Sequence, residues 1–244
     1  MEHFGVRVQR GPKNGLRLVR EEYARISKTN TTWFPRERFP KLWEAQADNF
    51  EDADHRILSD EWCQRHRALA LENFDLNMQF FERLDRGSFE AAVARMLETV
   101  PGLTEIYDLG PWEKKAGLYV MVLDEYKQMY VGHTGAANGV KARIRQHWSS
   151  SKAFDRLLWG TVEGSILSID SFRALDTTRI FVAKPRNREL AEAKLIRAIG
   201  REFLANRVYG GSPRLVTMQA ALGDGLVFTR DLADDGVIAE TDGG

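Results

Sequence analysis

Glu192 stands where the helical pattern of its segment calls for an apolar side chain. Leu195, Ile196 and Ile199 follow it by three, four and seven residues, and this spacing puts all four side chains on one helical face. A carboxylate on a buried face is normally paired, hydrogen-bonded or bound to a metal. Two interpretations therefore stay open, a structural salt bridge with a nearby arginine and a catalytic or metal-binding carboxylate.

Arg143 and His147 form a second group that could do chemistry. They stand four residues apart and flank the apolar stripe of Val140, Ile144 and Trp148, so we expect both at the same edge of the core. Arginine is a fixed cation that suits a phosphate, and histidine exchanges a proton near neutral pH. The pair could bind a phosphate and move a proton beside it, although such pairs are also common on solvated helix faces.

Three strands and two helices are expected to position these residues. Residues 117–123 are apolar on both faces, which favours a strand buried between two layers. A polar connection of four residues leads to a second strand at 128–132, so the two strands form a β-hairpin. The arginine and histidine follow on a helix, and after a third strand at 177–183 the helix of 185–199 carries the glutamate.

The order of these residues and elements resembles the GIY-YIG nuclease superfamily. Its members carry two tripeptides on paired strands, then a helix with an arginine and a histidine or tyrosine, then a glutamate and often a later asparagine. The matching positions, all within 117–206, are Gly117-Leu118-Tyr119, Tyr130-Val131-Gly132 after ten intervening residues, Arg143, His147, Glu192 and Asn206. The resemblance implies an α+β fold with a small three-stranded antiparallel sheet flanked by helices, preceded here by a mostly helical N-terminal region.

The resemblance also implies a divalent-metal-dependent endonuclease that hydrolyses phosphodiester bonds. Glu192 would be the sole protein ligand of a Mg²⁺ or Mn²⁺ ion, a reasonable arrangement because magnesium keeps several of its waters. The metal would stabilise the leaving 3′ oxygen, and Arg143 would hold the scissile phosphate. Asn206 completes the catalytic set that the resemblance implies.

A tyrosine hydroxyl is expected to take the proton from the attacking water. Tyr130 is the first candidate and Tyr119 the second. Because a phenol has a pKa of about 10, it is a weak base at neutral pH, so it needs help from the metal, a cation or a histidine. Many relatives place a lysine directly after the second tripeptide, where this chain has His133. His133 and His147 both remain candidates for that help.

The net charge is zero, with 35 basic and 35 acidic residues, but the charges are unevenly spread. Residues 1–40 and 117–206 each carry a net charge of +5, whereas 41–116 carry −7 and 207–244 carry −3. This pattern predicts a polyanion partner, duplex DNA first of all, on a face formed by the basic blocks with the acidic block turned away. Chance unevenness is the alternative explanation.

Six basic residues are candidates for contacts with the nucleic-acid backbone. Within residues 29–43, Trp33, Phe34, Phe39 and Trp43 are interleaved with cations, and such a segment can stack bases and hold phosphates. The same aromatic residues could instead pack onto the body of the protein. The candidates are Arg36 and Arg38 in this segment, and Lys141, Arg145, Lys152 and Arg156 on and after the helix that carries the arginine and histidine.

Turn signals between residues 101 and 116 end a helical block, one of whose helices should begin after Ser59. We expect a mostly helical N-terminal region at 1–105 for target recognition or dimerisation. A nuclease domain should follow at 106–210, and a C-terminal extension with an acidic tail at 211–244.

The 244 residues are 43% apolar and 29% charged, which is typical of a globular protein. The longest apolar runs span only a few residues, whereas a membrane-spanning helix needs about 20, and the N-terminus has no apolar leader. A single cysteine, Cys63, cannot build a disulfide framework. We therefore expect a cytoplasmic protein without a membrane partner.

Several functions share such a site. A restriction enzyme, a mobile-element nuclease and a repair nuclease are all compatible with it, and a homodimer stays open as an alternative to a monomer. A ribonuclease or toxin would keep the same residues and cleave RNA, whereas a non-catalytic nucleic-acid-binding module would retain only the fold. The complete set of tyrosine, arginine, histidine, glutamate and asparagine favours an enzyme.

Overall fold

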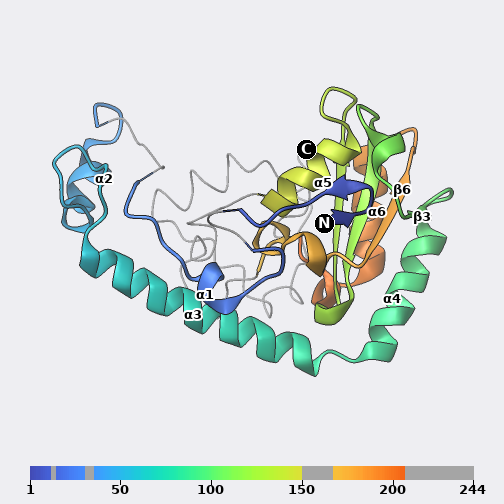
Figure 1. Cartoon of the computed structure of the whole chain (residues 1–244), viewed down its shortest axis with the longest axis horizontal. Helices are drawn as coiled ribbons and strands as arrows, with labels where there is room; N and C mark the ends of the chain where they lie inside the picture. The colour runs from blue at the N-terminus through green and yellow to red at the C-terminus, as the bar shows by residue number, and fades with distance from the viewer. Residues whose placement is uncertain (12–14, 31–35, 150–166, 207–244) are drawn as a thin grey trace, which may run out of the picture.

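A four-stranded antiparallel sheet organises the part of the chain that carries the expected site. The computed structural model describes residues 1–11, 15–30, 36–149 and 167–206. Helices lie on both faces of the sheet, which makes the fold α+β (Figure 1). The strands have the spatial order β3-β6-β4-β5, and their bounds are Thr104–Ile106 for β3, Gly117–Leu123 for β4, Gln128–Thr134 for β5 and Arg179–Ala183 for β6.

The sheet has one strand more than the three expected from the sequence. β3 pairs with β6 in antiparallel register, with Glu105 opposite Phe181. This strand is three residues long and two of them are exposed, so no alternation of apolar and polar side chains marks it in the sequence. The expected count of three strands is therefore wrong, whereas the antiparallel hairpin of β4 and β5 is confirmed.

The hairpin turn is closed by a residue in the left-handed conformation. β4 is buried along its whole length, because side chains pack on both faces of the sheet. A short 3₁₀ helix, Asp124–Tyr126, follows β4, and Lys127 adopts a φ of 51° before β5 begins. β5 extends to Thr134, two residues beyond the expected 128–132, and it therefore includes His133.

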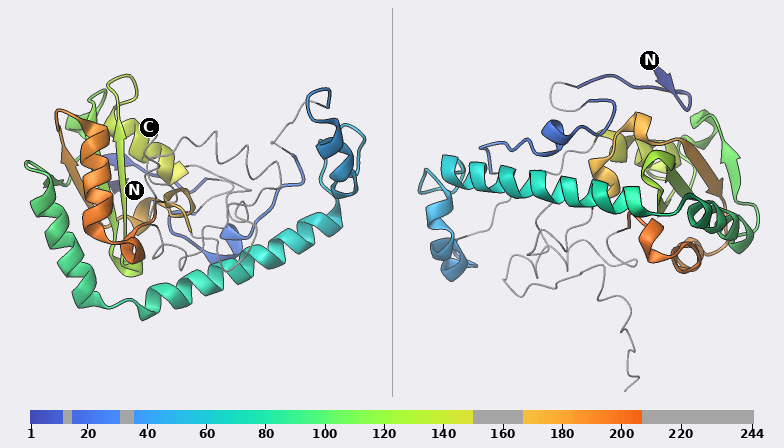
Figure 2. Two further views of the ribbon diagram at one scale, coloured as in Figure 1. Left: turned by 180° about the vertical axis from the view of Figure 1, so that it is seen from behind. Right: turned by 90° about the horizontal axis from the view of Figure 1, so that it is seen from below.

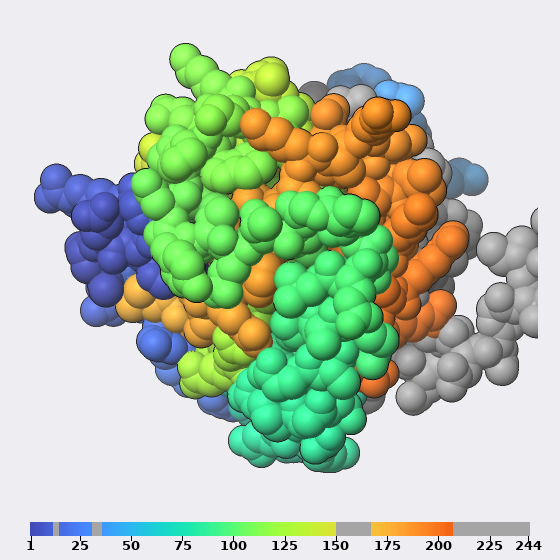
Figure 3. Space-filling model, turned by 90° about the vertical axis from the view of Figure 1, so that its right-hand side faces the viewer, coloured from blue at the N-terminus to red at the C-terminus, as the bar shows by residue number. Residues whose placement is uncertain are grey.

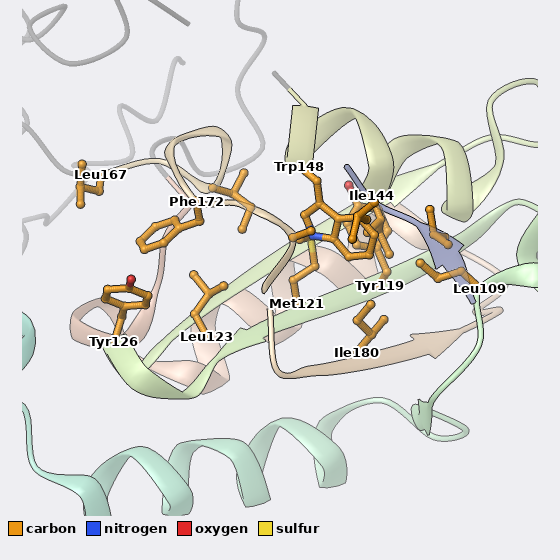
Figure 4. Packing of buried hydrophobic residues seen from close by; sticks show 14 of the residues in the cluster. Leu109, Tyr119, Met121, Leu123, Tyr126, Ile144, Trp148, Leu167, Phe172 and Ile180 are labelled. Atoms are coloured by element: carbon orange, nitrogen blue, oxygen red, sulfur yellow. The ribbon is translucent and has the colours of Figure 1, made fainter. Parts of the chain in front are cut away.

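Separate hydrophobic clusters lie on the two faces of the sheet. α5 (Gly139–Ser149) covers one face, where Met121 and Ile144 belong to the same cluster (Figure 4). α4 (Arg86–Thr99) and α6 (Arg188–Ile199) cover the other face and pack against each other (Figures 2 and 3). Successive residues of β4 alternate between the two clusters, as the period of a strand requires.

The first residues of the chain belong to the core on the α5 face. β1 (Glu2–His3) and β2 (Val6–Arg7) pair as an antiparallel hairpin. Val6 and Tyr23 are buried in the same cluster as Tyr119 of β4. The hydrophobic core therefore runs across the expected domain boundary at residue 105.

One long helix connects this core with α2 and the residues around it, at the far end of the molecule. α3 (Asp60–Arg83) begins after Ser59, whose side-chain oxygen accepts a hydrogen bond from the backbone N–H of Trp62 at 3.2 Å, as predicted. α2 (Pro40–Ala45) lies at the opposite end of α3 from the sheet (Figure 1). Among the helices of the described ranges, none combines the length and the apolar character needed to cross a membrane.

The aromatic residues around α2 pack on the protein itself where the structure describes them. The rings of Trp43 and His55 stack with their centroids 3.9 Å apart, and Phe50 also stacks on His55 at 4.3 Å. Trp33 and Phe34 lie outside the described residues. The stacking of Trp43 fits the alternative in which this segment folds onto the protein.

Cations of the first basic block pair with carboxylates of the acidic block. Arg20 pairs with Asp75 at 2.6 Å, and Lys28 pairs with Asp60 at 2.7 Å and with Glu51 at 2.8 Å. Exposed pairs stabilise a fold only slightly, but these pairs bring the two blocks side by side. The expectation that the acidic block turns away from the first basic block is wrong for these residues.

We expect Val6→Ala to lower the free energy of unfolding by about 1–3 kcal/mol, because it leaves a cavity in the core that the N-terminal hairpin shares with the sheet. Val6 is 4% exposed, whereas Val19 is 47% exposed. Val19→Ala is therefore the matched control and should change the free energy of unfolding by less than about 0.5 kcal/mol. Urea denaturation measures both, and equal values would show that the hairpin adds nothing to the core.

Candidate active site

The hairpin brings the two expected tyrosines to one face of the sheet. Tyr119 lies opposite Gly132, and Tyr130 lies opposite Met121. Because directly opposite residues share a face and the side-chain period of a strand is two, both phenols point toward α5. Their ring centroids are 6.2 Å apart.

The absence of a side chain at Gly132 makes this arrangement possible. A Cβ atom at this position would lie 2.6 Å from the hydroxyl oxygen of Tyr119 and 2.7 Å from its Cζ. It would also lie 3.0 Å from Cε1 of Tyr130. These separations are shorter than van der Waals contact, so the second tripeptide needs its glycine to let the Tyr119 ring cross β5.

His147 and Asp170 continue a buried chain of hydrogen bonds from Tyr119. The Tyr119 hydroxyl lies 2.9 Å from Nε2 of His147, and Nδ1 of His147 lies 2.7 Å from Oδ1 of Asp170. All three side chains are buried. An ionised carboxylate can only accept, so it places a proton on Nδ1, and the Nε2 of a neutral His147 then accepts from the tyrosine.

Asp170 is the residue of this site that sequence reasoning missed. It lies in a short 3₁₀ helix, Ile169–Ser171, within an irregular segment that precedes β6. No periodic pattern or motif spacing connects it with His147. The only signal in the sequence was indirect, since a histidine beside a buried helical stripe needs a hydrogen-bond partner.

Burial raises the pKa values of both tyrosines. The pKa of Tyr119 is well above its ordinary value, because burial disfavours the phenolate and the nearby Tyr130 adds to that effect. Burial raises the pKa of Tyr130 to about 12. The Arg143 guanidinium acts in the opposite direction on both phenols. Tyr119 is fully buried and Tyr130 only partly, so Tyr130 is the more exposed of the two residues.

Glu192 meets His133 on the other face of the sheet. His133 lies opposite Leu118, which puts its ring on the α6 side, and its Nδ1 contacts Oε2 of Glu192. The Glu192 side chain is 14% exposed, and Leu195 and Ile196 beside it are buried as predicted. The carboxylate therefore sits on the buried helical face, and its ion-pair partner within the part of the chain that the structure describes is a histidine, not the arginine of the salt-bridge interpretation.

The two candidate histidines have different partners. His147 bonds to Tyr119, whereas His133 bonds to Glu192. The charge of Glu192 is a smaller cause of the raised pKa of both tyrosines, after burial. The two tyrosines and His147 contact one another on the α5 face, whereas Glu192 lies on the α6 face with His133.

Asn206 interacts with the backbone of β5. Its Oδ1 accepts from the N–H of Val131 at 2.9 Å, and its Nδ2 donates to the carbonyl of Val131 at 2.7 Å. The side chain thereby satisfies the backbone of one residue of β5, which is the edge strand of the sheet among the described residues. In this structure the Asn206 side chain fixes the last described residues against β5.

The expected nucleic-acid contacts are not gathered at this site. Lys141 pairs with Glu113 at 3.2 Å, and Arg145 is exposed on α5. Arg36 and Arg38 are exposed just before α2, at the other end of α3 from the sheet (Figure 1). Lys152 and Arg156 lie outside the described residues.

The donor set around Glu192 fits a largely hydrated cation. Within the described ranges, no group of three or more His, Cys, Asp and Glu side chains is arranged to enclose a metal. Glu192 instead offers a single, slightly exposed carboxylate with His133 on one of its oxygens. Mg²⁺ prefers oxygen ligands and keeps several waters, so one carboxylate is compatible with it.

Comparison with protein-family models, with curated proteins and with solved structures found no match to this chain. The chemistry assigned to the site therefore rests on the residues themselves and on their geometry.

We expect Gly132→Ala to lower the free energy of unfolding by about 1–3 kcal/mol, because the added methyl forces the Tyr119 ring away from its place over β5. Gly135→Ala is the matched control, since a Cβ at Gly135 meets no described atom within 4 Å. Thermal or chemical unfolding of the two variants measures the effect. If both variants are as stable as the parent protein, Tyr119 does not require a glycine beneath it.

Proposed function

We propose that the protein is a divalent-metal-dependent endonuclease that hydrolyses phosphodiester bonds in duplex DNA. The observation that carries this proposal is the buried network of Tyr119, His147 and Asp170 on one face of β5, with the carboxylate of Glu192 on the other face. The groups that this arrangement offers are the partly buried phenol of Tyr130, the guanidinium of Arg143, the imidazole of His147 and the slightly exposed carboxylate of Glu192. They supply a base, a phosphate ligand and a metal ligand.

Arg143 is the residue suited to hold the scissile phosphate. Its guanidinium lowers the pKa values of both phenols, donates to Oε1 of Gln146 and belongs to a partly exposed residue. A planar guanidinium offers two parallel donors to phosphate oxygens. Such donors stabilise the charge that develops on the phosphate in the transition state.

Tyr130 is the residue suited to receive the proton of the attacking water. The water oxygen forms a bond to phosphorus, its proton moves to the phenolate oxygen of Tyr130, and the bond to the 3′ oxygen breaks with its electron pair on the leaving oxygen. The pKa of about 12 makes the phenolate scarce at neutral pH, and Arg143 opposes this effect. Tyr119 is less suited, because its hydroxyl is buried and bonded to His147.

Glu192 would hold Mg²⁺ or Mn²⁺ at this site. When bound, the cation would neutralise charge on the phosphate and stabilise the leaving oxygen. His133 contacts one oxygen of the carboxylate and so fixes its orientation, as hydrogen-bonded partners of metal ligands commonly do.

We expect Glu192→Gln to reduce metal-dependent cleavage of plasmid DNA by roughly 100-fold or more, because the amide keeps the shape of the side chain and loses its charge. DNA binding and the unfolding temperature should change little. Glu189→Gln is the matched control, since Glu189 is exposed on the same helix one turn earlier. A marked loss of stability with cleavage intact would instead identify Glu192 as a structural partner of His133.

We expect Asp170→Asn to lower the cleavage rate by roughly 10- to 100-fold, the range seen when the carboxylate partner of a functional imidazole is removed. The amide can donate to Nδ1 and thus favour the other tautomer of His147. DNA affinity should stay the same, and ¹⁵N NMR of the imidazole should show the proton on Nδ1 in the parent protein and on Nε2 in the variant. Ser171→Ala, in the same 3₁₀ helix, is the control for a general disturbance. If the tautomer of His147 changes and the cleavage rate does not, His147 takes no part in the reaction.

A further inference from the structure

Four cations gather at one end of the sheet, and we call Lys114, Lys115, Lys184 and Arg186 the sheet-end cations. β4 begins at this end, where Gly117 lies opposite Thr134, the last residue of β5. β6 ends here as well, with Ala183 opposite Leu118. The segment before β4 and the segment after β6 therefore leave the sheet side by side.

Trp112 connects these segments. The Nζ atom of Lys184 lies 5.3 Å from the centroid of the Trp112 ring. The same ring fills the space next to Gly117, since a Cβ at Gly117 would lie 2.9 Å from Cζ3 of Trp112. Lys184 and the chain that enters β4 are thus in contact through one side chain.

The sheet-end cations also adjoin the beginning of α5. The backbone N–H of Val140 donates to the carbonyl of Lys115 at 3.0 Å. A Cβ at Gly139 would lie 2.5 Å from the backbone nitrogen of Lys114. Lys114 and Lys115 therefore lie against the first turn of the helix that carries Arg143.

The positive charge of this cluster is not neutralised within the described part of the chain. All four side chains are exposed, and none has a carboxylate of the described residues within ion-pair distance. The neighbouring Lys141, in contrast, pairs with Glu113 at 3.2 Å. Like charges on one end of the sheet repel one another, and an anionic ligand would reduce that repulsion.

The cluster lies about one helical turn from the candidate active site along two helices. α5 begins at Gly139, four residues before Arg143, and α6 begins at Arg188, four residues before Glu192. One turn of a helix rises about 5.4 Å. Phosphates along one DNA strand recur about every 3.4 Å of helix axis. The beginning of α5, which Lys114 and Lys115 adjoin, is therefore about 5 Å along the helix axis from Arg143, so phosphates that neighbour the scissile one are the nearest candidates for contact.

We infer that the sheet-end cations bind the backbone phosphates of duplex DNA that adjoin the scissile phosphate. This inference rests on the proposed function and adds the surface that fixes the substrate. Contacts of this kind position a duplex and carry no sequence information. The contacts would determine which phosphate of the bound DNA strand lies at Arg143. Recognition of the DNA sequence would come from other residues.

The test compares two double substitutions in the full chain. Lys115→Gln/Lys184→Gln removes two positive charges at this end of the sheet. Arg83→Gln/Arg86→Gln removes two exposed charges near the β4–β5 turn, at the opposite end of the same sheet. Affinity for a fluorescein-labelled 30-base-pair duplex is measured in EDTA, which prevents cleavage, at several salt concentrations, and thermal unfolding verifies that each variant is folded.

The two substitutions should affect the salt dependence differently. Each lost phosphate contact lowers the steepness of log affinity against log salt by about 0.9 for B-DNA, so Lys115→Gln/Lys184→Gln should lower it by about 1.8. The control should leave the slope within about 0.5 of the parent value. Equal slopes for the parent and the Lys115→Gln/Lys184→Gln variant, or an equal loss in the control, would overturn the inference while leaving the nuclease proposal standing. A parent protein that neither binds nor cleaves duplex DNA would overturn both.

Discussion

The phenol ring of Tyr119 crosses the neighbouring strand at Gly132, and the geometry of the candidate site depends on this crossing. It allows the hydroxyl to reach His147, whose other ring nitrogen meets a carboxylate of the segment before β6. That segment is in turn fixed by the N-terminal residues, since the N–H of Leu175 donates to the carbonyl of Leu16 at 2.9 Å. One steric constraint in the hairpin thus couples the sheet, α5 and the beginning of the chain.

The candidate site residues lie on the two opposite faces of β5. The tyrosines lie on the face toward α5 in a largely buried network, where loss of a proton is unfavourable. His133 and Glu192 lie on the face toward α6, where the carboxylate is partly exposed. Among the described residues, β5 is the edge strand of the four-stranded sheet. A phosphate at this edge would meet Arg143 from α5 and Glu192 from α6.

The sequence predicted what depends on local spacing and missed what depends on distant contacts. Helical periodicity placed Glu192 on the buried face of α6, and two apolar strands joined by a short polar connection predicted the hairpin. Neither pattern could show that His133 would be the partner of Glu192, because that pair joins a strand and a helix 59 residues apart. Asp170 was missed because its segment has no period. The burial of Val6 was missed because an irregular, Arg-rich segment gives no sign of the core that it joins.

The most direct test of the central claim is incubation of the full chain with plasmid DNA and, separately, with a structured RNA at low salt, with Mg²⁺ or with EDTA. We expect nicked or linear plasmid with Mg²⁺, intact plasmid with EDTA and little loss of the RNA. Cleavage of the RNA alone would instead identify the protein as a ribonuclease. Hydrolysis of neither nucleic acid, by a folded protein supplied with Mg²⁺ or Mn²⁺, would contradict the assignment of Tyr130, Arg143 and Glu192 to a phosphodiesterase site.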